Sequence, residues 1–131
     1  MPQRDSLFAG AWRHPTLVIG LDVPKPELDR RIAARTRRMF EAGVEEEVRA
    51  ALTGELSATA CKIIGLDEIA TLPAKEAIET LIARTRRYAA YQRKWLRRLD
   101  GLVMVAADRP PEETAAEIVT LARAREHLPR P

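Results

Sequence analysis

The spacing of apolar residues changes along the 131-residue chain, and each change predicts a new element. The stretch TLVIGL (16–21) is short, rich in β-branched residues and apolar on both faces, which is typical of a buried strand. From Pro26 the apolar positions fall at helical spacing, and Gly43 supplies a C-terminal stop. Residues 1–13 show no period and are expected to be irregular.

Four more helices and a second strand are expected after this point. The helices cover 44–52, 57–72, 74–99 and 111–127, and the strand covers 102–107. In the helix at 57–72, Ser57 is the expected N-cap and Pro73 marks the end. Gly65 inside that helix costs about 1 kcal/mol relative to alanine. It therefore indicates either a close helix crossing or the close approach of a ligand backbone, with Lys62 one turn earlier to meet a phosphate.

The pattern predicts one domain that is mainly helical, with two short strands far apart in the chain. Strands that are apolar on both faces belong to parallel sheets covered by helices, and such sheets need further strands. The chain is therefore interpreted as part of a larger α/β protein, or as one that pairs with a partner. Residues 1–131 would form a single unit, in which 26–99 is the helical region and 102–131 holds the second strand and the closing helix.

The helix expected at 74–99 combines the strongest periodic signal with an uneven charge. Its apolar stripe carries Ile78, Leu81, Ile82, Thr85, Tyr88, Ala89, Gln92, Trp95, Leu96 and Leu99. Residues 74–100 contain eight lysines or arginines and three acids, a net charge of +5, whereas the whole chain carries +3. One basic stripe on a near-neutral body indicates a polyanionic partner.

Three interpretations of RTRRYAAYQRKWLRRL (84–99) are open: a solvated helix face, a membrane-surface helix, or a contact with nucleic acid. No acid lies within this stretch, so its cations repel one another by roughly a few tenths of a kcal/mol per pair, which phosphates would offset. Gln92 lies on the apolar stripe, where a buried amide needs partners and is also able to read a base edge. Both features favour RNA. A membrane-surface role is disfavoured, because Trp95 shares the stripe with Ile78 and Leu81.

No set of residues in the chain is expected to carry out chemistry by itself. Cys61 is the only cysteine, His14 and His127 lie far apart, and no glycine pair has the GxxxxGK[ST] spacing of a phosphate loop. No apolar run approaches the about 20 residues of a membrane span, and the N-terminus has no signal-peptide pattern. We expect no catalytic residue, no metal ligand and no membrane partner, and a cytoplasmic location.

Three segments in order resemble the tRNA dimethylallyltransferases, also called isopentenyl-tRNA transferases. GLDVPKPELDRRIAARTRRMFEAGVEEEVRAAL (20–52) resembles a strand ending in Gly-Leu, followed by an L-x-x-RI-x-x-R helix and an E-V pair. ACKIIGLDEI (60–69) resembles the A-x-x-x-IGY-[KR]-E segment of that family. TRRYAAYQRKWLRR (85–98) resembles its T-R-x-[YLF]-A-[KR]-R-Q-x-T-W-[FL]-R signature. The resemblance covers about residues 12–125.

This resemblance implies a fold and a reaction. The fold is the C-terminal part of a P-loop α/β fold with a helical insertion. The reaction moves a dimethylallyl group from its diphosphate to the exocyclic nitrogen of the adenosine beside the anticodon. The P-loop that holds dimethylallyl diphosphate and the aspartate that acts as general base lie upstream in the family, so this chain alone is expected to be inactive. Mg²⁺ is expected for the full-length family, which is expected to be monomeric.

The resemblance also implies two tRNA-contact segments. Their residues are Lys62, Ile63, Ile64, Gly65, Leu66 and Asp67, and then Ala90, Tyr91, Gln92, Arg93, Lys94, Trp95, Leu96 and Arg97. Arg31 matches an arginine near the reaction centre. The departures from the family pattern are Leu66 for Tyr, Asp67 for Lys or Arg, Ala90-Tyr91 for Lys-Arg, and Lys94 for Thr. Asp67 would repel a phosphate, while Arg93 and Lys94 would offset the lost cations.

The leading hypothesis is therefore the tRNA-binding portion of a tRNA dimethylallyltransferase, with the anticodon arm of tRNA as its partner. A gene fragment, a start site assigned too late and half of a split enzyme are all open. The alternative hypothesis is a stand-alone helical RNA-binding module without catalysis. A third is an interaction helix that binds no nucleic acid.

Overall fold

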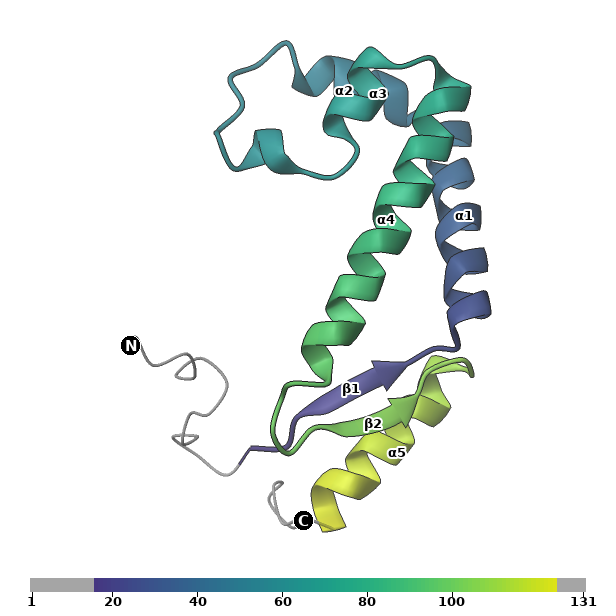
Figure 1. The fold of residues 1–131 in the computed structure, drawn as a ribbon, viewed down its shortest axis with the longest axis vertical. Coiled ribbons are helices and arrows are strands. Elements are labelled where there is room, and N and C mark those ends of the chain that lie inside the picture. The colour runs from purple at the N-terminus through teal and green to yellow at the C-terminus, as the bar shows by residue number, and fades with distance from the viewer. Residues whose placement is uncertain (1–15, 125–131) are drawn as a thin grey trace. The chain divides into compact units, whose positions relative to one another are not determined.

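The computed structural model describes residues 16–124, which are mainly helical with two short parallel strands (Figure 1). The elements are β1 (Ile19–Asp22), α1 (Lys25–Glu41), α2 (Val44–Ala51), the 3-10 helix η1 (Ala60–Lys62), α3 (Leu66–Thr71), α4 (Ala74–Leu96), β2 (Val103–Ala106) and α5 (Pro111–Ala124). The chain divides into two compact units. We call 26–91 the helical unit, and 16–25 with 92–124 the strand unit. The expected single unit over 1–131 stays a prediction.

Most of the elements expected from the apolar spacing are confirmed. α1 has Pro26 in its first turn, and Gly43 follows it with a φ of +92° as the N-cap of α2. Both strands are present and pair in parallel, although each is shorter than expected. The irregular start expected at 1–13 and the helix end expected at His127 lie outside the described residues.

The single helix expected over 57–72 is wrong. The chain forms the short turn η1 and then the separate helix α3, with Gly65 as the N-cap of α3. Gly65 has a φ of +104°, a left-handed conformation that glycine adopts without the clash of a Cβ and that would interrupt any continuous helix. The Ser57 hydroxyl accepts a hydrogen bond from the Ala60 N–H at 3.1 Å, but the N-cap of η1 is Thr59, so the expected N-cap at Ser57 is wrong. Pro73 follows the end of α3, as expected.

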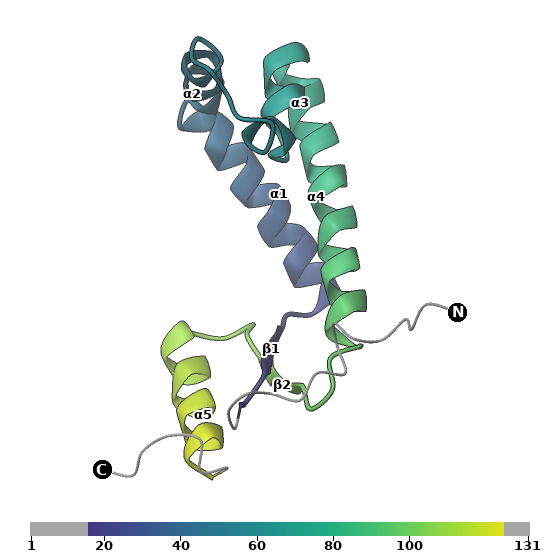
Figure 2. The same cartoon turned by 90° about the vertical axis from the view of Figure 1, so that its left-hand side faces the viewer.

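The strand unit is built on a two-stranded parallel sheet. Its register pairs are Ile19 with Val103, Gly20 with Met104, Leu21 with Val105 and Asp22 with Ala106. α5 packs against β2 (Figure 2), and the Thr114 hydroxyl donates a hydrogen bond to the Ala106 carbonyl at 3.3 Å. The helix is thereby attached to the carboxyl end of the strand that precedes it.

Burial within this sheet is uneven. Val105 is 1% exposed, whereas Leu21 is 56% and Met104 48% exposed. The two strands are therefore not buried on both faces within the described residues, and the expectation that they need further elements to cover them stays a prediction. Because each Å² of apolar surface left in water forgoes about 25 cal/mol, the sheet gains less from burial than a covered parallel sheet does.

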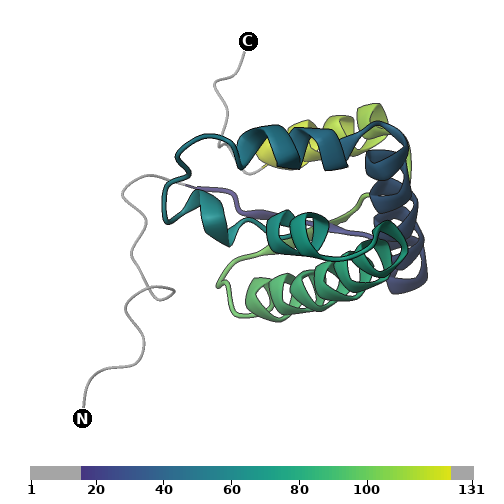
Figure 3. The same ribbon diagram turned by 90° about the horizontal axis from the view of Figure 1, so that it is seen from above.

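The core of the helical unit lies between α1 and α4, which run side by side (Figures 1 and 2). Ile32 and Ala33 of α1 pack with Ile82 of α4, and none of the three is more than 8% exposed. The partly buried residues around them are Leu28, Ile78 and Ala89. α3 lies between α2 and α4 (Figure 3) and packs against α2. Helical spacing thus places one apolar face of each long helix in a shared core.

The apolar stripe expected along α4 is buried only in the first part of the helix. Leu81 and Ile82 are buried, whereas Tyr88 and Trp95 are 53% and 42% exposed. The expectation that the whole stripe packs against neighbouring elements is therefore wrong for Tyr88, Gln92 and Trp95, although Ala89 packs against the core. The aromatic side chains there lie at the surface, where the periodicity alone placed them in a core.

Candidate nucleic-acid interface

The first candidate segment, residues 62–67, joins η1 to α3 in the helical unit, and we call it the 62–67 loop. Lys62 and Asp67 are exposed, and Ile63 is 62% exposed. Ile64 and Leu66 are half-buried. The Lys62 ammonium and the Ile63 side chain are thus available at the surface of this loop. The Asp67 carboxylate is exposed there as well and would repel an anionic ligand.

Gly65 is the buried point of the 62–67 loop. A Cβ on this residue would lie 3.1 Å from the Leu81 Cδ1 of α4, closer than an ordinary van der Waals contact. The positive φ and this close approach both require glycine. Of the two explanations raised by the sequence, close packing within the protein accounts for Gly65.

The Glu68 side chain links the loop to α4 through two hydrogen bonds. Its Oε2 accepts a hydrogen bond from the Gly65 N–H at 3.1 Å, and its Oε1 accepts one from the Arg84 Nη1 of α4. Glu68 is only 8% exposed. Burial raises the pKa of Glu68, but the hydrogen bonds from Arg84 and from the backbone N–H groups of Glu68 and Gly65 bring it below its ordinary value of 4.5. The carboxylate is therefore ionised at neutral pH and holds both neighbours.

The cations of α4 have acidic partners that the sequence pattern did not reveal. Arg84 pairs with Glu68, and the Arg86 Nε lies 3.7 Å from the Asp29 Oδ1 of α1. Arg86 also donates a hydrogen bond to the Asp29 carbonyl at 3.4 Å. The premise that these cations are not neutralised is therefore wrong for Arg84 and Arg86. Their partners lie far away in sequence, so no local spacing rule predicts them.

The second candidate segment, residues 90–97, ends α4, and we call it the 90–97 segment. Ala90 and Tyr91 belong to the helical unit, and Tyr91 is 59% exposed. Gln92 begins the part in the strand unit and is exposed, so the expectation of a buried amide in need of partners is wrong. Lys94 and Arg97 are exposed as well.

Arg93 differs from the other cations of the 90–97 segment. Its Nη2 lies 3.1 Å from the Asp22 Oδ1 at the end of β1, and its Nη1 donates a hydrogen bond to the Val23 carbonyl at 3.0 Å. Arg93 therefore attaches the end of α4 to the end of β1 within the strand unit. Its contact with tRNA stays a prediction.

A cavity of about 390 Å³ lies beside this ion pair within the strand unit. The residues that line it include Leu21, Asp22, Arg93, Leu96, Arg97 and Met104. In the same stretch of the chain, the Arg98 guanidinium lies 5.2 Å from the centre of the Trp95 ring, within the range of a cation–π contact. The surface here combines apolar side chains with guanidinium groups, which suits the stacking and phosphate contacts of RNA recognition.

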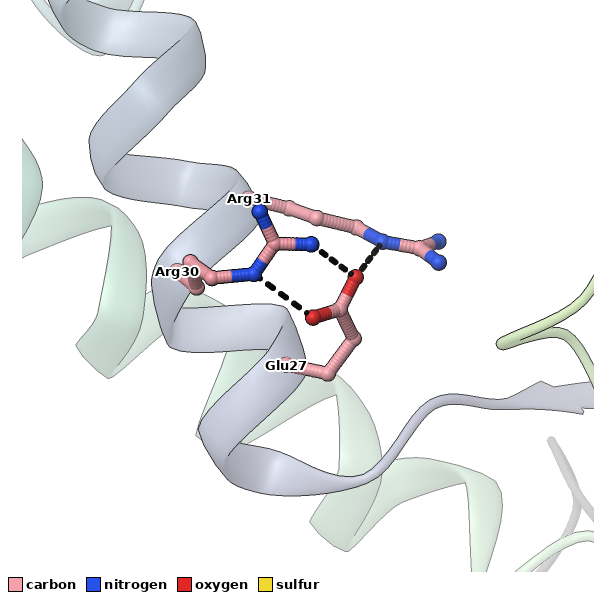
Figure 4. A network of polar contacts seen from close by, with 3 residues as sticks. All are labelled: Glu27, Arg30 and Arg31. Carbon is pink, nitrogen blue, oxygen red and sulfur yellow. Dashed lines mark hydrogen bonds and ion pairs between the residues drawn. The ribbon is translucent and has the colours of Figure 1, made fainter.

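Arg31, the residue expected near the reaction centre, belongs to a charged cluster at the start of α1 (Figure 4). The Arg31 Nε lies 2.6 Å from the Glu27 Oε1, and the Arg30 Nη2 lies 2.8 Å from the same oxygen. Hydrogen bonds from Arg30 and Arg31 lower the pKa of Glu27 from 4.5 to about 2. Glu27 thus orients Arg31, and the proximity of Arg31 to a reaction centre stays a prediction.

The residues missed by sequence reasoning are the acids that organise the candidate segments, namely Asp22, Asp29 and Glu68. A signal for Glu68 was present, because a glutamate three residues after an N-cap commonly bonds back to the cap N–H. That signal was hidden by the assignment of Gly65 to a helix interior. No comparable local signal exists for Asp22 or Asp29.

Two further properties concern residues 16–124 only. No helix in this range is long and apolar enough to cross a membrane. Across the same range, no group of three or more His, Cys, Asp or Glu side chains is arranged to hold a metal ion.

Comparison with known proteins adds a family match. The model of the family described as IPP transferase matches residues 2–99. The chain is 43% identical over 93 residues to the tRNA dimethylallyltransferase of Thermobifida fusca. This alignment covers 66% of this chain and 29% of that protein. It is 36% identical over 106 residues to the tRNA dimethylallyltransferase of Corynebacterium jeikeium, covering 76% of this chain and 34% of that protein.

A solved structure is also similar. The crystal structure of the full-length tRNA isopentenylpyrophosphate transferase of Bacillus halodurans aligns with a TM-score of 0.73 and 26% sequence identity. The alignment covers 83% of this chain and 38% of that chain. The expected fold, part of the fold of this enzyme, is confirmed. The chain spans about a third of the length of the relatives that it matches.

Proposed function

Because the chain belongs to the IPP transferase family, we propose that it supplies the tRNA-binding portion of a tRNA dimethylallyltransferase. The enzyme would move a dimethylallyl group from dimethylallyl diphosphate to the exocyclic nitrogen of the adenosine beside the anticodon, and diphosphate would leave. The observation that carries this proposal is the family match over residues 2–99, which includes the 62–67 loop and the 90–97 segment.

In this proposal the 62–67 loop contacts the anticodon arm through its exposed residues. The Lys62 ammonium meets a phosphate, and the 62%-exposed Ile63 packs against a sugar or a base. Asp67 opposes a phosphate, so the RNA backbone passes on the Lys62 side of the loop. Gly65 lets the loop lie close to α4, which keeps its exposed residues in a fixed arrangement.

The 90–97 segment contributes in two ways. Lys94 and Arg97 are exposed and are suited to meet phosphates. Gln92 and Trp95, also exposed, are suited to hydrogen bonding with a base edge and to stacking. Arg93 binds Asp22 and Val23, so its main effect on tRNA binding is to fix the direction of the segment that carries the other residues.

Prenyl transfer would require groups that this sequence does not contain. No GxxxxGK[ST] phosphate loop is present in it. We therefore propose that the binding site for the diphosphate and the general base lie in another part of the enzyme, and that this chain alone is inactive. Mg²⁺ is proposed for the full-length enzyme. Residues 16–124 offer no metal-binding cluster that fits it, so no step of the proposal passes through a metal here. The full-length enzyme would be a cytoplasmic monomer.

The proposal is tested by titrating the 131-residue chain with an anticodon stem-loop RNA that carries the target adenosine. Binding should weaken by about tenfold or more when Lys62, Lys94 and Arg97 are all replaced by alanine, since each lost phosphate contact removes electrostatic affinity. Replacing Arg37, Arg38 and Arg49, exposed cations outside both segments, is the control for net charge. Equal losses in the two triple variants would contradict the assignment of the segments.

A parallel assay with dimethylallyl diphosphate separates this function from its alternative. Binding without prenyl transfer is the expected result for the chain alone. If prenyl transfer appears only when the remaining two-thirds of a relative's transferase is added as a separate polypeptide, the transferase role is supported. Binding that stays without transfer in that mixture would favour a stand-alone RNA-binding module.

A further inference from the structure

Glu68 lies directly under the 62–67 loop and is a buried charged residue of the helical unit. It is 8% exposed, while its partner Arg84 keeps 46% of its side chain in solvent. A buried carboxylate is costly unless it is paired with a cation and hydrogen-bonded. Here each carboxylate oxygen has its own partner. One partner is the Gly65 N–H of the loop, and the other is the Arg84 guanidinium of α4.

The two partners of Glu68 determine where the loop lies. The Gly65 N–H fixes the backbone at the turn of the loop, and Arg84 fixes Glu68 to α4. The 3.1 Å approach of a Gly65 Cβ position to Leu81 shows that the loop backbone is pressed against the same helix. The backbone is therefore held at Gly65, while Lys62 and Ile63 remain exposed on the N-terminal side of that point.

We propose that Glu68 and Arg84 are positioning residues that hold the 62–67 loop in the conformation that contacts tRNA. This inference rests on the proposed function. Arg84 does not act as a phosphate ligand, because Glu68 already neutralises it. Glu68 increases RNA affinity although its charge repels RNA. Simple electrostatics predicts the opposite effect for Glu68, whereas for Arg84 the two explanations differ in the salt dependence of binding.

The first test is the variant Glu68→Gln in the full 131-residue chain, titrated with the anticodon stem-loop. A glutamine amide replaces one of the two carboxylate oxygens by an NH₂ group that only donates, so one of the two hydrogen bonds, from the Gly65 N–H or from Arg84, loses its acceptor atom. Positioning predicts about tenfold weaker binding. Electrostatics alone predicts equal or tighter binding, because a negative charge is removed. Glu79→Gln, at an exposed position of α4, is the matched control and should bind as tightly as the wild type or more tightly.

We call the contacts of Glu68 with Arg84 and with the Gly65 N–H the Glu68 clasp. The second test is Arg84→Met, which removes the contact that the clasp makes with α4. Binding should weaken while the slope of log affinity against log salt stays unchanged. If Arg84 met a phosphate, the slope would fall by about 0.7–0.9 instead. Arg87→Met removes the same charge from an exposed position of the same helix and should weaken binding less than Arg84→Met does.

The outcomes separate the two levels of inference. If the wild-type chain does not bind the stem-loop, the proposed function fails. If it binds, and Glu68→Gln binds equally or more tightly while folded, the positioning role is wrong. The rate of hydrogen exchange at the Gly65 amide reports directly whether its hydrogen bond to Glu68 is formed. We expect faster exchange in both Glu68→Gln and Arg84→Met. If Glu68→Gln does not fold, Arg84→Met decides, and unchanged affinity in that variant overturns the proposal.

Discussion

In the helical unit Ile32 and Ile82 are 6% and 8% exposed, whereas in the strand unit Leu21 and Met104 are 56% and 48% exposed. The helical unit buries the apolar side chains that lie between α1 and α4, although Ile63, Tyr88 and Tyr91 stay exposed. The strand unit has one helix, α5, against its two strands and leaves apolar strand residues in solvent. A two-stranded sheet with exposed apolar residues is marginal by itself. The difference teaches that α1 and α4 supply the partners for their facing apolar side chains, whereas the two strands leave Leu21 and Met104 without cover in this chain.

Among the ion pairs of the described residues, the least exposed acid lies in the helical unit, which also holds more exposed pairs such as Arg30 with Glu27. In the helical unit, Glu68 is buried and joins two elements through both of its oxygens. In the strand unit, the pair of Arg93 and Asp22 has side-chain exposures of 34% and 47%. Exposed pairs contribute about 0–1 kcal/mol, whereas breaking a buried one leaves an uncompensated charge. The Glu68–Arg84 pair therefore reinforces packing in the helical unit, whereas the Arg93–Asp22 pair stabilises the strand unit less.

The largest expected effect comes from truncating one apolar side chain in each unit, a buried one in the helical unit and an exposed one in the strand unit. Ile82→Ala should lower the free energy of unfolding by about 3 kcal/mol, because it leaves a cavity between α1 and α4. Leu21→Ala should change it by less than about 0.5 kcal/mol, since the side chain is already mostly in water. Urea unfolding followed by circular dichroism measures both. Similar losses in the two variants would break the comparison between the units.

A smaller effect is expected from adding a methyl group to one glycine in each unit. Gly65→Ala should cost about 1–3 kcal/mol, because it forces alanine to a positive φ beside the Leu81 side chain. Gly20→Ala should cost less, because the nearest atom to the new Cβ is the Met104 sulfur, which belongs to a flexible and half-exposed side chain. The same urea titrations measure the difference. A larger loss for Gly20→Ala would show that the strand unit is the more tightly packed of the two.

The smallest expected effect concerns pH and the Glu27 cluster of the helical unit. The pKa of Glu27 lies at about 2 in the folded chain and at 4.5 as an ordinary value, so its pairing with Arg30 and Arg31 stabilises the fold above pH 4.5. This contribution falls as the pH drops from 4.5 towards 2. NMR titration of the Glu27 side chain should give a midpoint well below 4.5, and the double variant Arg30→Gln, Arg31→Gln should raise it. An unchanged midpoint in that variant would mean that the cluster is not formed.

The order and type of most elements were predictable because they depend on local signals. Apolar spacing specified α1 and α4, Gly43 and Pro73 marked ends, and β-branched runs marked both strands. The helix at 57–72 was misassigned because Gly65 fits two roles, a costly helix residue or a left-handed cap, and the local signal for the cap, Glu68 three residues later, is weak without the tertiary contact with Leu81. Local sequence carries no information about that contact.

The candidate site was predictable in its segments and not in its organisation. Motif resemblance identified residues 62–67 and 90–97, because those patterns lie within short stretches of the chain. The acids that pair with Arg84, Arg86 and Arg93 come from other elements, at separations of 16, 57 and 71 residues. Charge counting over one helix therefore overestimated the number of cations available for RNA, and only the fold reveals which of them already have partners.

The most direct test of the account is a map of amide chemical-shift changes on the 131-residue chain as an anticodon stem-loop RNA is added. The account predicts the largest changes in the 62–67 loop and at Gln92, Lys94 and Arg97, with small changes in α2 and α5. A stem without its loop, as a control, should cause weaker changes, because the bases of the loop are then absent. Changes centred on α2 or α5, or no saturable change at low salt, would contradict the claim that these two segments bind tRNA.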